Sequence, residues 1–326
     1  MWLAVLLFCI GLLCLIKGGD WFVDGATGIA QRFHVPELLI GATVVSIGTT
    51  LPEVMVSATS ALQGSPSIAY GNAIGSIICN TALISGLTVA IAPSIVEKKP
   101  LRMPVLFFFG SAFLYAGLAY VNRCFSRING IIFLLIFCVY MTLLIRQAII
   151  QGKQTQASKA AAADTEEHKP SPLWKDILFL IIGAVLIAVG ARLLVDNGII
   201  IAQELGVPET VIAVTFVALG TSLPELVTAI VSLAKGHGAL SLGNIIGANL
   251  FNLVLVSGAA ITLRPFEVPN EKELAGMNAS LVVDIPLMLL VMAILTLPAL
   301  FCGKLKRYQG ILLLALYAGY CVFQFV

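Results

Sequence analysis

Charged residues are scarce in this chain. Only 11% of its 326 residues are Asp, Glu, Lys or Arg, whereas 59% are hydrophobic, and the mean hydropathy is +1.00. Such a composition is typical of polytopic membrane proteins and not of soluble domains, whose surfaces need many charges. The scarcity therefore excludes a soluble enzyme, and nothing in the sequence indicates binding to nucleic acid or an obligatory protein partner.

The sequence also lacks paired cysteines and the features of a cleaved leader. Its seven cysteines are scattered, mostly within apolar runs, so they predict neither disulfides nor a zinc site. The first run, MWLAVLLFCIGLLCLIKGG, has no basic residue before its apolar part and no clear small-residue cleavage site. We interpret it as a membrane span that is retained.

Long apolar runs fill most of the chain. Runs of about 20 residues can cross the bilayer as helices, which predicts an all-α polytopic membrane protein with the lipid bilayer as its surroundings. Ten spans are expected, at 2–31, 36–62, 67–92, 102–121, 128–148, 173–204, 208–234, 239–263, 278–300 and 308–325.

One connector has the composition of a soluble segment. Residues 151–172 are rich in Ala, Ser, Gln and Lys and lack an apolar pattern, which indicates a flexible linker too short to fold as a domain. This linker divides the chain into two halves of five spans each, residues 1–150 and 173–326.

The two halves are repeats of one another. A shift of 172 residues aligns HVPE at 34–37 with GVPE at 206–209, GTTLPE at 48–53 with GTSLPE at 220–225, and GNAIGSIICN at 71–80 with GNIIGANLFN at 243–252. Because each half has an odd number of spans, the second half should cross the membrane in the opposite sense, as an inverted repeat.

The distribution of basic residues sets the orientation. With the N-terminus outside, thirteen Lys and Arg side chains fall on the inner side and four on the outer side. Basic residues favour the cytoplasmic side, so the linker is expected to be cytoplasmic and both termini outside.

Each half carries a glutamate inside an apolar span, Glu53 and Glu225. An ionisable group within a membrane is costly and usually functional. Pro52 and Pro224 directly precede these glutamates and lack the backbone N–H of a regular helix, which predicts that the helix breaks or kinks there. Freed carbonyl oxygens and the hydroxyls of the neighbouring Thr and Ser residues would then surround each carboxylate.

Such a group of oxygens suits a hard cation. An inverted repeat brings Glu53 and Glu225 together near the membrane midplane, and the next spans add the equivalent amides of Asn80 and Asn252. Asn72 and Asn244 lie two helical turns earlier, on roughly the same faces. Two carboxylates would be neutralised by one Ca²⁺, with Na⁺ ions or protons replacing it on a return step, which describes an antiporter.

The paired G-T-[ST]-L-P-E and G-N-[AI]-I-G-x-x-x-x-N motifs resemble the alpha repeats of the calcium/cation antiporter superfamily, most closely its prokaryotic sodium/calcium exchanger branch. The resemblance covers nearly the whole chain. It implies ten helices in two inverted repeats with broken helices 2, 3, 7 and 8, and exchange of Na⁺ for Ca²⁺ across a prokaryotic cytoplasmic (inner) membrane by alternating access, without a cofactor.

The resemblance also assigns metal ligands. Glu53 and Glu225, with the carbonyls of Thr49 and Thr221, would hold Ca²⁺. The sodium sites would use the same glutamates, with Asn80 and Asn252 at the centre. Their other positions are Ser46, Thr50, Ser76, Ala218, Ser222 and Ala248. The chain departs from the family at Asn252, where an aspartate is common, and at Ala248, where a serine is common.

Three other functions are alternatives to this interpretation. A proton-coupled Ca²⁺/cation exchanger on the same fold is the nearest, because a buried carboxylate pair can bind protons. The hydroxyl-rich turns favour Na⁺, since a proton needs only the carboxylate. A cation channel would show a repeated pore filter. An intramembrane protease would need a catalytic dyad, which the two glutamates could mimic, but the neighbouring hydroxyls and amides serve coordination rather than peptide hydrolysis.

A few charged residues lie elsewhere in the spans. Lys17, Asp20 and Asp24 lie in the first span, and Arg192 and Asp196 lie in the sixth, with Asp24 and Asp196 in register. We expect these side chains to form ion pairs or to reach the interface, not to bind the transported ion.

Overall fold

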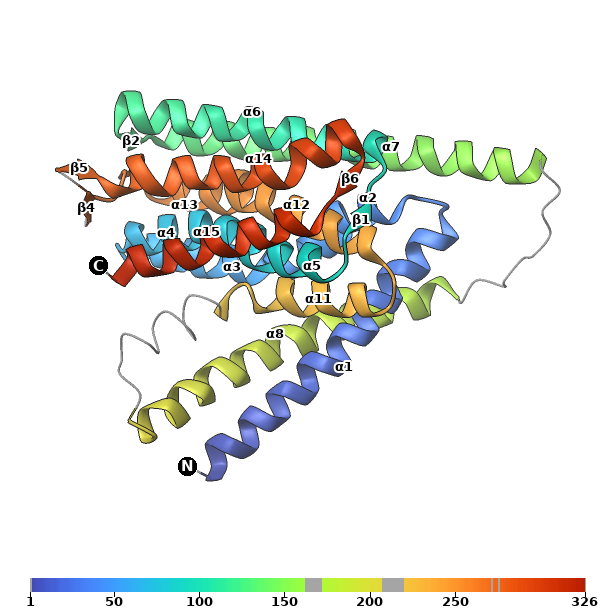
Figure 1. Ribbon diagram of the computed structural model, residues 1–326, viewed down its shortest axis with the longest axis horizontal. Coiled ribbons are helices and arrows are strands. Elements are labelled where there is room, and N and C mark those ends of the chain that lie inside the picture. Colours follow the sequence, from blue (N-terminus) through green and yellow to red (C-terminus); the bar gives the residue numbers. More distant parts are fainter. Residues whose placement is uncertain (1, 162–171, 207–219, 271, 275, 326) are drawn as a thin grey trace. The chain divides into compact units, whose positions relative to one another are not determined.

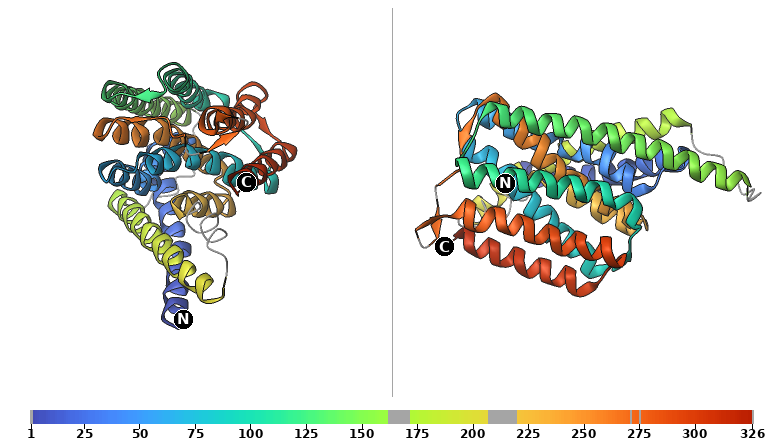
Figure 2. Two further views of the ribbon diagram at one scale, coloured as in Figure 1. Left: turned by 90° about the vertical axis from the view of Figure 1, so that its left-hand side faces the viewer. Right: turned by 90° about the horizontal axis from the view of Figure 1, so that it is seen from above.

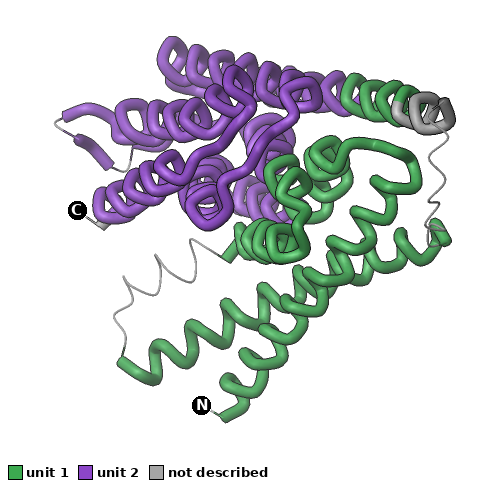
Figure 3. Tube along the Cα trace, turned by 45° about the vertical axis from the view of Figure 1, so that its right-hand side comes forward, with its two compact units in different colours: residues 1–49, 143–244, 325 green, residues 50–142, 245–324, 326 purple. Residues whose placement is uncertain are grey.

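The computed structural model describes residues 2–161, 172–206, 220–270, 272–274 and 276–325, and most of them are helical (Figure 1). The chain divides into two compact units, coloured separately in Figure 3. Unit 1 comprises residues 1–49, 143–244 and 325, and unit 2 comprises residues 50–142, 245–324 and 326. Each unit therefore takes segments from both halves of the sequence.

Among the described residues, the elements are α-helices, four π-helical segments and six short strands. The α-helices are α1 Trp2–Arg32, α2 Glu37–Ile40, α3 Ser46–Leu62, α4 Pro66–Ile78, α5 Gly86–Ile91, α6 Lys98–Asn122, α7 Arg127–Ala161, α8 Leu173–Glu204, α11 Leu223–Ala234, α12 Gly238–Phe251, α13 Ser257–Leu263, α14 Ile285–Cys302 and α15 Arg307–Phe325. The π-helical segments are η1 Gly41–Val45, η2 Cys79–Ser85, η4 Asn252–Val256 and η5 Ser280–Asp284. The strands are β1 Ser94–Ile95, β2 Cys124–Phe125, β3 Phe266–Glu267, β4 Glu273–Leu274, β5 Met277–Asn278 and β6 Lys304–Leu305.

Eight helices of the described residues are long and apolar enough to cross a membrane. They correspond to the first six predicted spans and to the eighth and ninth, which confirms a polytopic membrane protein. The seventh predicted span lies partly outside the described residues, and its described part is the short apolar helix α11. The tenth is the helix α15, of 19 residues.

In unit 1, α1 and α8 lie side by side and run in opposite directions (Figure 1). Glycines line the contact: a Cβ atom added to Gly11 would lie 2.9 Å from the carbonyl oxygen of Gly190, and one added to Gly18 would lie 3.0 Å from that of Gly183. Backbones approach this closely only where side chains are absent. The four glycines therefore fix the register of the two helices.

A second backbone contact in unit 1 joins α2 and η1 to the start of α12. A Cβ atom on Gly41 would lie 2.8 Å from the backbone nitrogen of Asn244, and a Cβ atom on Gly243 would lie 2.8 Å from the carbonyl carbon of Leu38. Small residues thus bring Asn244 next to the end of η1, where α3 begins with Ser46.

In unit 2, α6, α14 and α15 run roughly along a common axis (Figure 2). Two antiparallel ribbons close its ends: β1 pairs with β6, with Ser94 opposite Leu305, and β2 pairs with β3, with Cys124 opposite Glu267. Since α6 runs from β1 to β2, the ribbons lie at opposite ends of this unit (Figure 1).

The predicted helix breaks are wrong for three of the four spans. The α-helix α3 continues through Pro52, and the third and eighth spans pass through η2 and η4 without interruption. A proline removes one N–H, and the residues on both sides still form their own helical bonds. A π-helical turn accommodates an extra residue within the helix, so η1, η2 and η4 replace the expected breaks. In the seventh span, α11 begins at Leu223, directly after a turn at Thr221 and Ser222.

The linker prediction also needs correction. The helix α7 continues to Ala161, so the first part of the predicted flexible linker, 151–161, is helical. Its Gln, Lys and Ala residues are good helix formers, and an existing helix extends more easily than a new one begins. The rest of the predicted linker up to residue 171 lies outside the described residues.

Candidate functional site

The predicted metal ligands fall into two sets, one in each unit. Ser46, Thr49, Thr221, Ser222 and Glu225 belong to unit 1. Thr50, Glu53, Ser76, Asn80, Ala248 and Asn252 belong to unit 2. Ala218 lies outside the described residues.

In unit 1, hydroxyls at the start of α3 meet Asn244. The Thr49 hydroxyl donates to Asn244 Oδ1 at 3.2 Å. Ser46 Oγ lies 3.0 Å from the carbonyl oxygen of Asn244 and 2.8 Å from that of Gly41. The glycine contact between η1 and α12 makes these bonds possible. Ser46 and Thr49 are thus held on one face, one helical turn apart.

Glu225 lies in the first turn of α11. The two residues before it are Leu223, which begins the helix, and Pro224, whose fixed φ suits the first turn. Free backbone N–H groups at a helix start favour a carboxylate. The side chain of Glu225 is fully buried, beside the Thr49 hydroxyl. The structure therefore brings together Thr49 and Glu225, two of the predicted ligands.

In unit 2, the side-chain amide of Asn72 forms a hydrogen bond with the backbone of Glu53. Asn72 Nδ2 donates to the carbonyl oxygen of Glu53 at 3.1 Å and to Ser57 Oγ at 2.8 Å. The side chain of Glu53 is fully buried. Asn72 therefore joins α4 to α3 and fixes the position of the Glu53 backbone along α3.

Asn80 and Asn252 lie at matching places, within η2 and at the start of η4. Both side chains are fully buried, and neither amide has a hydrogen-bond partner among the described residues. Ser76 and Ala248, one turn earlier on α4 and α12, are buried as well, and α4 packs against η4. The π-helical turns thus place two unsatisfied amides inside unit 2.

Two hydroxyl groups of the predicted ligands are also buried without a hydrogen-bond partner in the described part of the chain. They are Thr50 Oγ1 and Ser222 Oγ. An unsatisfied buried polar group costs about 1–3 kcal/mol, so several in one protein indicate that a ligand or water completes them. Carboxylate, amide and hydroxyl oxygens are suitable ligands for Ca²⁺ and Na⁺. The described residues contain no cluster of three His, Cys, Asp or Glu, so softer metals have no matching site there.

Residues 3–146 and 175–326 match the family described as sodium/calcium exchanger protein. The chain belongs to this family. The exchanger is thereby placed in the prokaryotic branch of the calcium/cation antiporter superfamily. The members of this family are transporters and not enzymes. The family match supports cation/Ca²⁺ exchange as the activity of this chain.

Relatives match the exchanger over nearly its whole length. An uncharacterized membrane protein of Methanocaldococcus jannaschii is 36% identical over 324 residues, which cover 97% of this chain and 96% of that protein. The sodium/calcium exchanger MaX1 of Methanosarcina acetivorans is 30% identical, with 98% of each chain covered. A solved structure of the sodium-calcium exchanger NCX_Mj, soaked with Na⁺ and Sr²⁺, has a TM-score of 0.80 and 33% identity, with 97% of each chain covered.

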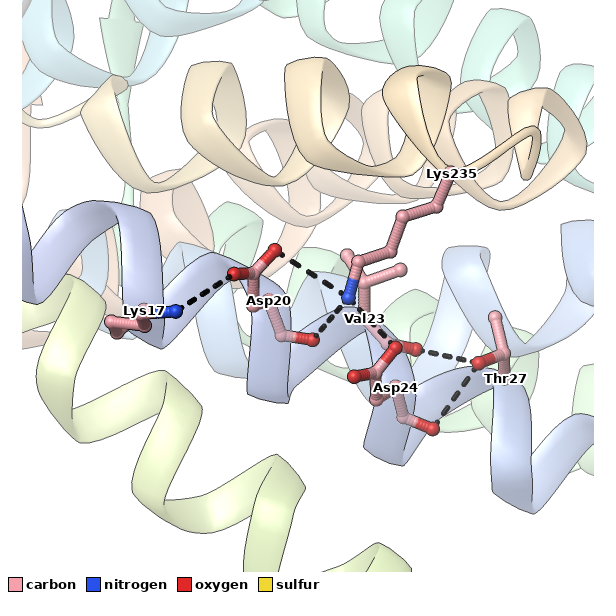
Figure 4. Close-up of polar contacts among 6 residues, drawn as sticks. All are labelled: Lys17, Asp20, Val23, Asp24, Thr27 and Lys235. Atoms are coloured by element: carbon pink, nitrogen blue, oxygen red, sulfur yellow. Dashed lines mark hydrogen bonds and ion pairs between the residues drawn. The ribbon is translucent and has the colours of Figure 1, made fainter.

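The charged residues of α1 form ion pairs, as predicted. Lys235, in the turn after α11, lies 2.7 Å from Asp24 Oδ1 and 3.5 Å from Asp20 Oδ1 (Figure 4). Lys17 lies 3.9 Å from Asp20 Oδ2. On α8, Arg192 and Asp196 pair at 3.5 Å. These charged side chains of α1 and α8 therefore have ion-pair partners within unit 1.

Sequence reasoning missed some polar residues of the exchanger. Asn72 and Asn244 were noted as equivalent positions, but their roles in holding Glu53, Ser46 and Thr49 follow only from the structure. Asn249 was missed altogether. Its repeat equivalent is Ile77, so comparing the two halves gave no signal there.

Proposed function

We propose that the exchanger moves Ca²⁺ across the membrane in exchange for Na⁺, with Ca²⁺ leaving the cytoplasm as Na⁺ enters. The observation that carries this proposal is the set of buried, unsatisfied oxygens at Thr50, Asn80, Ser222 and Asn252. All four positions were expected from the paired motifs, and their hydroxyl and amide oxygens suit a hard cation.

The ligands divide by charge. Glu53 and Glu225 supply formal charge −2, which one Ca²⁺ neutralises, together with the carbonyl oxygens of Thr49 and Thr221. The neutral oxygens of Ser46, Thr50, Ser76, Asn80, Ser222 and Asn252, and the backbone at Ala218 and Ala248, complete the positions for Na⁺. An ion is released only when others replace it, because an empty site with two buried charges is costly.

Alternating access follows from the inverted repeat. We propose ten helices in two five-helix halves, 1–150 and 173–326, joined by a cytoplasmic linker at 151–172, with both termini outside a prokaryotic inner membrane. Contacts within each unit support this symmetry. Gly11 meets Gly190 while Gly18 meets Gly183, so positions 172 residues apart exchange roles. The ribbons β1–β6 and β2–β3 likewise join loops at equivalent places.

Sodium as the coupling ion rests on the hydroxyl ligands and on relatives. MaX1 is named a sodium/calcium exchanger, and NCX_Mj is described as a sodium-calcium exchanger. Coordination by hydroxyl and amide oxygens serves Na⁺, whereas a proton would need only the carboxylates.

The experiment is uptake of radioactive calcium into proteoliposomes loaded with Na⁺ and diluted into Na⁺-free buffer, compared with matched vesicles that carry only a proton gradient. Uptake driven by the Na⁺ gradient alone is expected. Uptake driven only by protons would assign the exchanger to H⁺-coupled Ca²⁺ transport. Uptake that persists without either gradient, and saturates with neither ion, would indicate a channel.

A further inference from the structure

A buried polar network lies next to the asparagines of unit 2. Asn249 Nδ2 donates to Thr81 Oγ1 at 2.7 Å and lies 3.2 Å from Met292 Sδ, and the Thr81 hydroxyl lies 3.3 Å from the same sulfur. All three side chains are fully buried. The network therefore connects α12, η2 and α14.

The orientation of the Asn249 amide follows from these neighbours. A thioether sulfur accepts hydrogen bonds and cannot donate, so the group that faces Met292 is the amide N–H₂. In the reversed orientation Oδ1 would face the sulfur with no hydrogen between them. Both hydrogens of Nδ2 are thus used by Thr81 and Met292. Oδ1 is left buried, without a hydrogen-bond partner in the described part of the chain.

Helix packing does not require an amide at this position. The repeat-equivalent residue of the first half is Ile77, which is also fully buried. An apolar side chain can therefore fill the equivalent position in the other half of the fold. A polar group within a membrane span is costly unless it is used, which indicates a use for Asn249 that the first half does not share.

Two residues of the network lie close in sequence to the candidate cation ligands. Thr81 follows Asn80 in the chain, and Asn249 precedes Asn252 by three residues, nearly one helical turn. We propose that Asn249 is a specificity-determining residue, whose Oδ1 binds the transported cation or a water molecule of its hydration shell. This inference rests on the proposed exchange function.

Cation binding by purified protein tests the inference without transport. The readout is the Ca²⁺ concentration that gives half-maximal thermal stabilisation in detergent, and the same for Na⁺. Asn249→Leu should raise the Ca²⁺ value roughly ten-fold, because a contact with a charged group is lost. Met292→Leu is the matched control: it removes one hydrogen-bond acceptor but keeps Oδ1, so its Ca²⁺ value should stay within about two-fold of the wild type.

A purely structural role predicts a different pattern. Asn249→Leu would then lower the unfolding temperature without cations and leave the half-maximal concentrations unchanged, and this result would overturn the inference. Asn249→Asp covers the case in which Asn249→Leu does not fold. The aspartate keeps an oxygen at the same place and can accept a hydrogen bond from the Thr81 hydroxyl. The added charge should lower the half-maximal Ca²⁺ concentration relative to that of Na⁺. An unchanged ratio would also overturn the inference.

The proposed exchange function can fail separately. A wild-type protein that Ca²⁺ stabilises, but that takes up no Ca²⁺ under a Na⁺ gradient, would reject Na⁺ coupling and leave the Asn249 result to stand. A wild-type protein that neither Ca²⁺ nor Na⁺ stabilises would overturn both.

Discussion

Lys235 Nζ lies 2.7 Å from Asp24 Oδ1, and through this ion pair the turn after α11 is joined to α1. Lys235 also donates to the backbone carbonyl oxygen of Asp20 at 3.0 Å (Figure 4). Lys235 thus reduces the repulsion between two carboxylates that lie on one face of α1, about one helical turn apart.

Replacing Lys235 should weaken unit 1 slightly. Its side chain and that of Asp24 are 27% and 50% exposed, so solvent screens the pair. We expect Lys235→Ala to lower the free energy of unfolding by about 0.5–1 kcal/mol, and less at high salt. Chemical denaturation in detergent at two salt concentrations measures this. Lys17→Ala, at a more exposed and longer contact, is the control and should have a smaller effect.

The glutamates are expected to be essential for transport. Glu53→Gln or Glu225→Gln removes one of two buried charges that balance Ca²⁺, and loss of a buried charge partner costs about 3–5 kcal/mol. Exchange should therefore fall by about 100-fold or more in proteoliposomes, while gel filtration still shows a folded protein. Full exchange by either variant would remove that glutamate from the site.

Asn252→Asp should make cation dependence vary with pH. At low pH the introduced carboxyl carries a proton and resembles the neutral amide, so the half-saturating Ca²⁺ concentration should match that of the wild type. At higher pH the added charge should lower it. Asn122→Asp, at the exposed end of α6, is the control. A profile independent of pH would place Asn252 outside the cation site.

The α1–α8 contact should not tolerate a side chain. A Cβ atom on Gly183 would lie 2.5 Å from the backbone nitrogen of Phe22 and 2.7 Å from its Cα, and backbone atoms cannot move aside as side-chain ends do. We expect Gly183→Ala to reduce stability by about 1–3 kcal/mol in thermal unfolding. Gly110→Ala on α6, where no atom lies within 4 Å of the added Cβ, should be neutral. Equal effects of the two changes would contradict the close contact.

Much of the fold could be predicted, and candidate site residues could be chosen, because membrane proteins carry strong signals in sequence. Long apolar runs define spans, and an acid such as Glu225 in an apolar span is conspicuous. The ion pairs of Asp20 and Asp24 were expected for the same reason. The partners of these acids could not be predicted, because Lys235 is separated from Asp24 by more than 200 residues.

The expected break at Pro52 was wrong because a single proline removes only one N–H from a helix. Pro52 stays within α3, and the irregular turns occur at η1, η2 and η4, whose sequences contain no proline. A π-helical turn has no simple sequence signature. Asn249 was missed for another reason. Comparison of the two halves identifies residues that both halves share, and Asn249 occurs in the second half alone.

The π-helical turns have a consequence for changes in chain length. A π turn holds more residues than an α turn, so deleting one residue from η2 or η4 can restore regular α-helical winding without removing a whole turn. The residues that follow would then keep their places along the helix axis, while Asn80 or Asn252 would point in a new direction. Single-residue deletions here should therefore preserve the membrane span while displacing its candidate cation ligand.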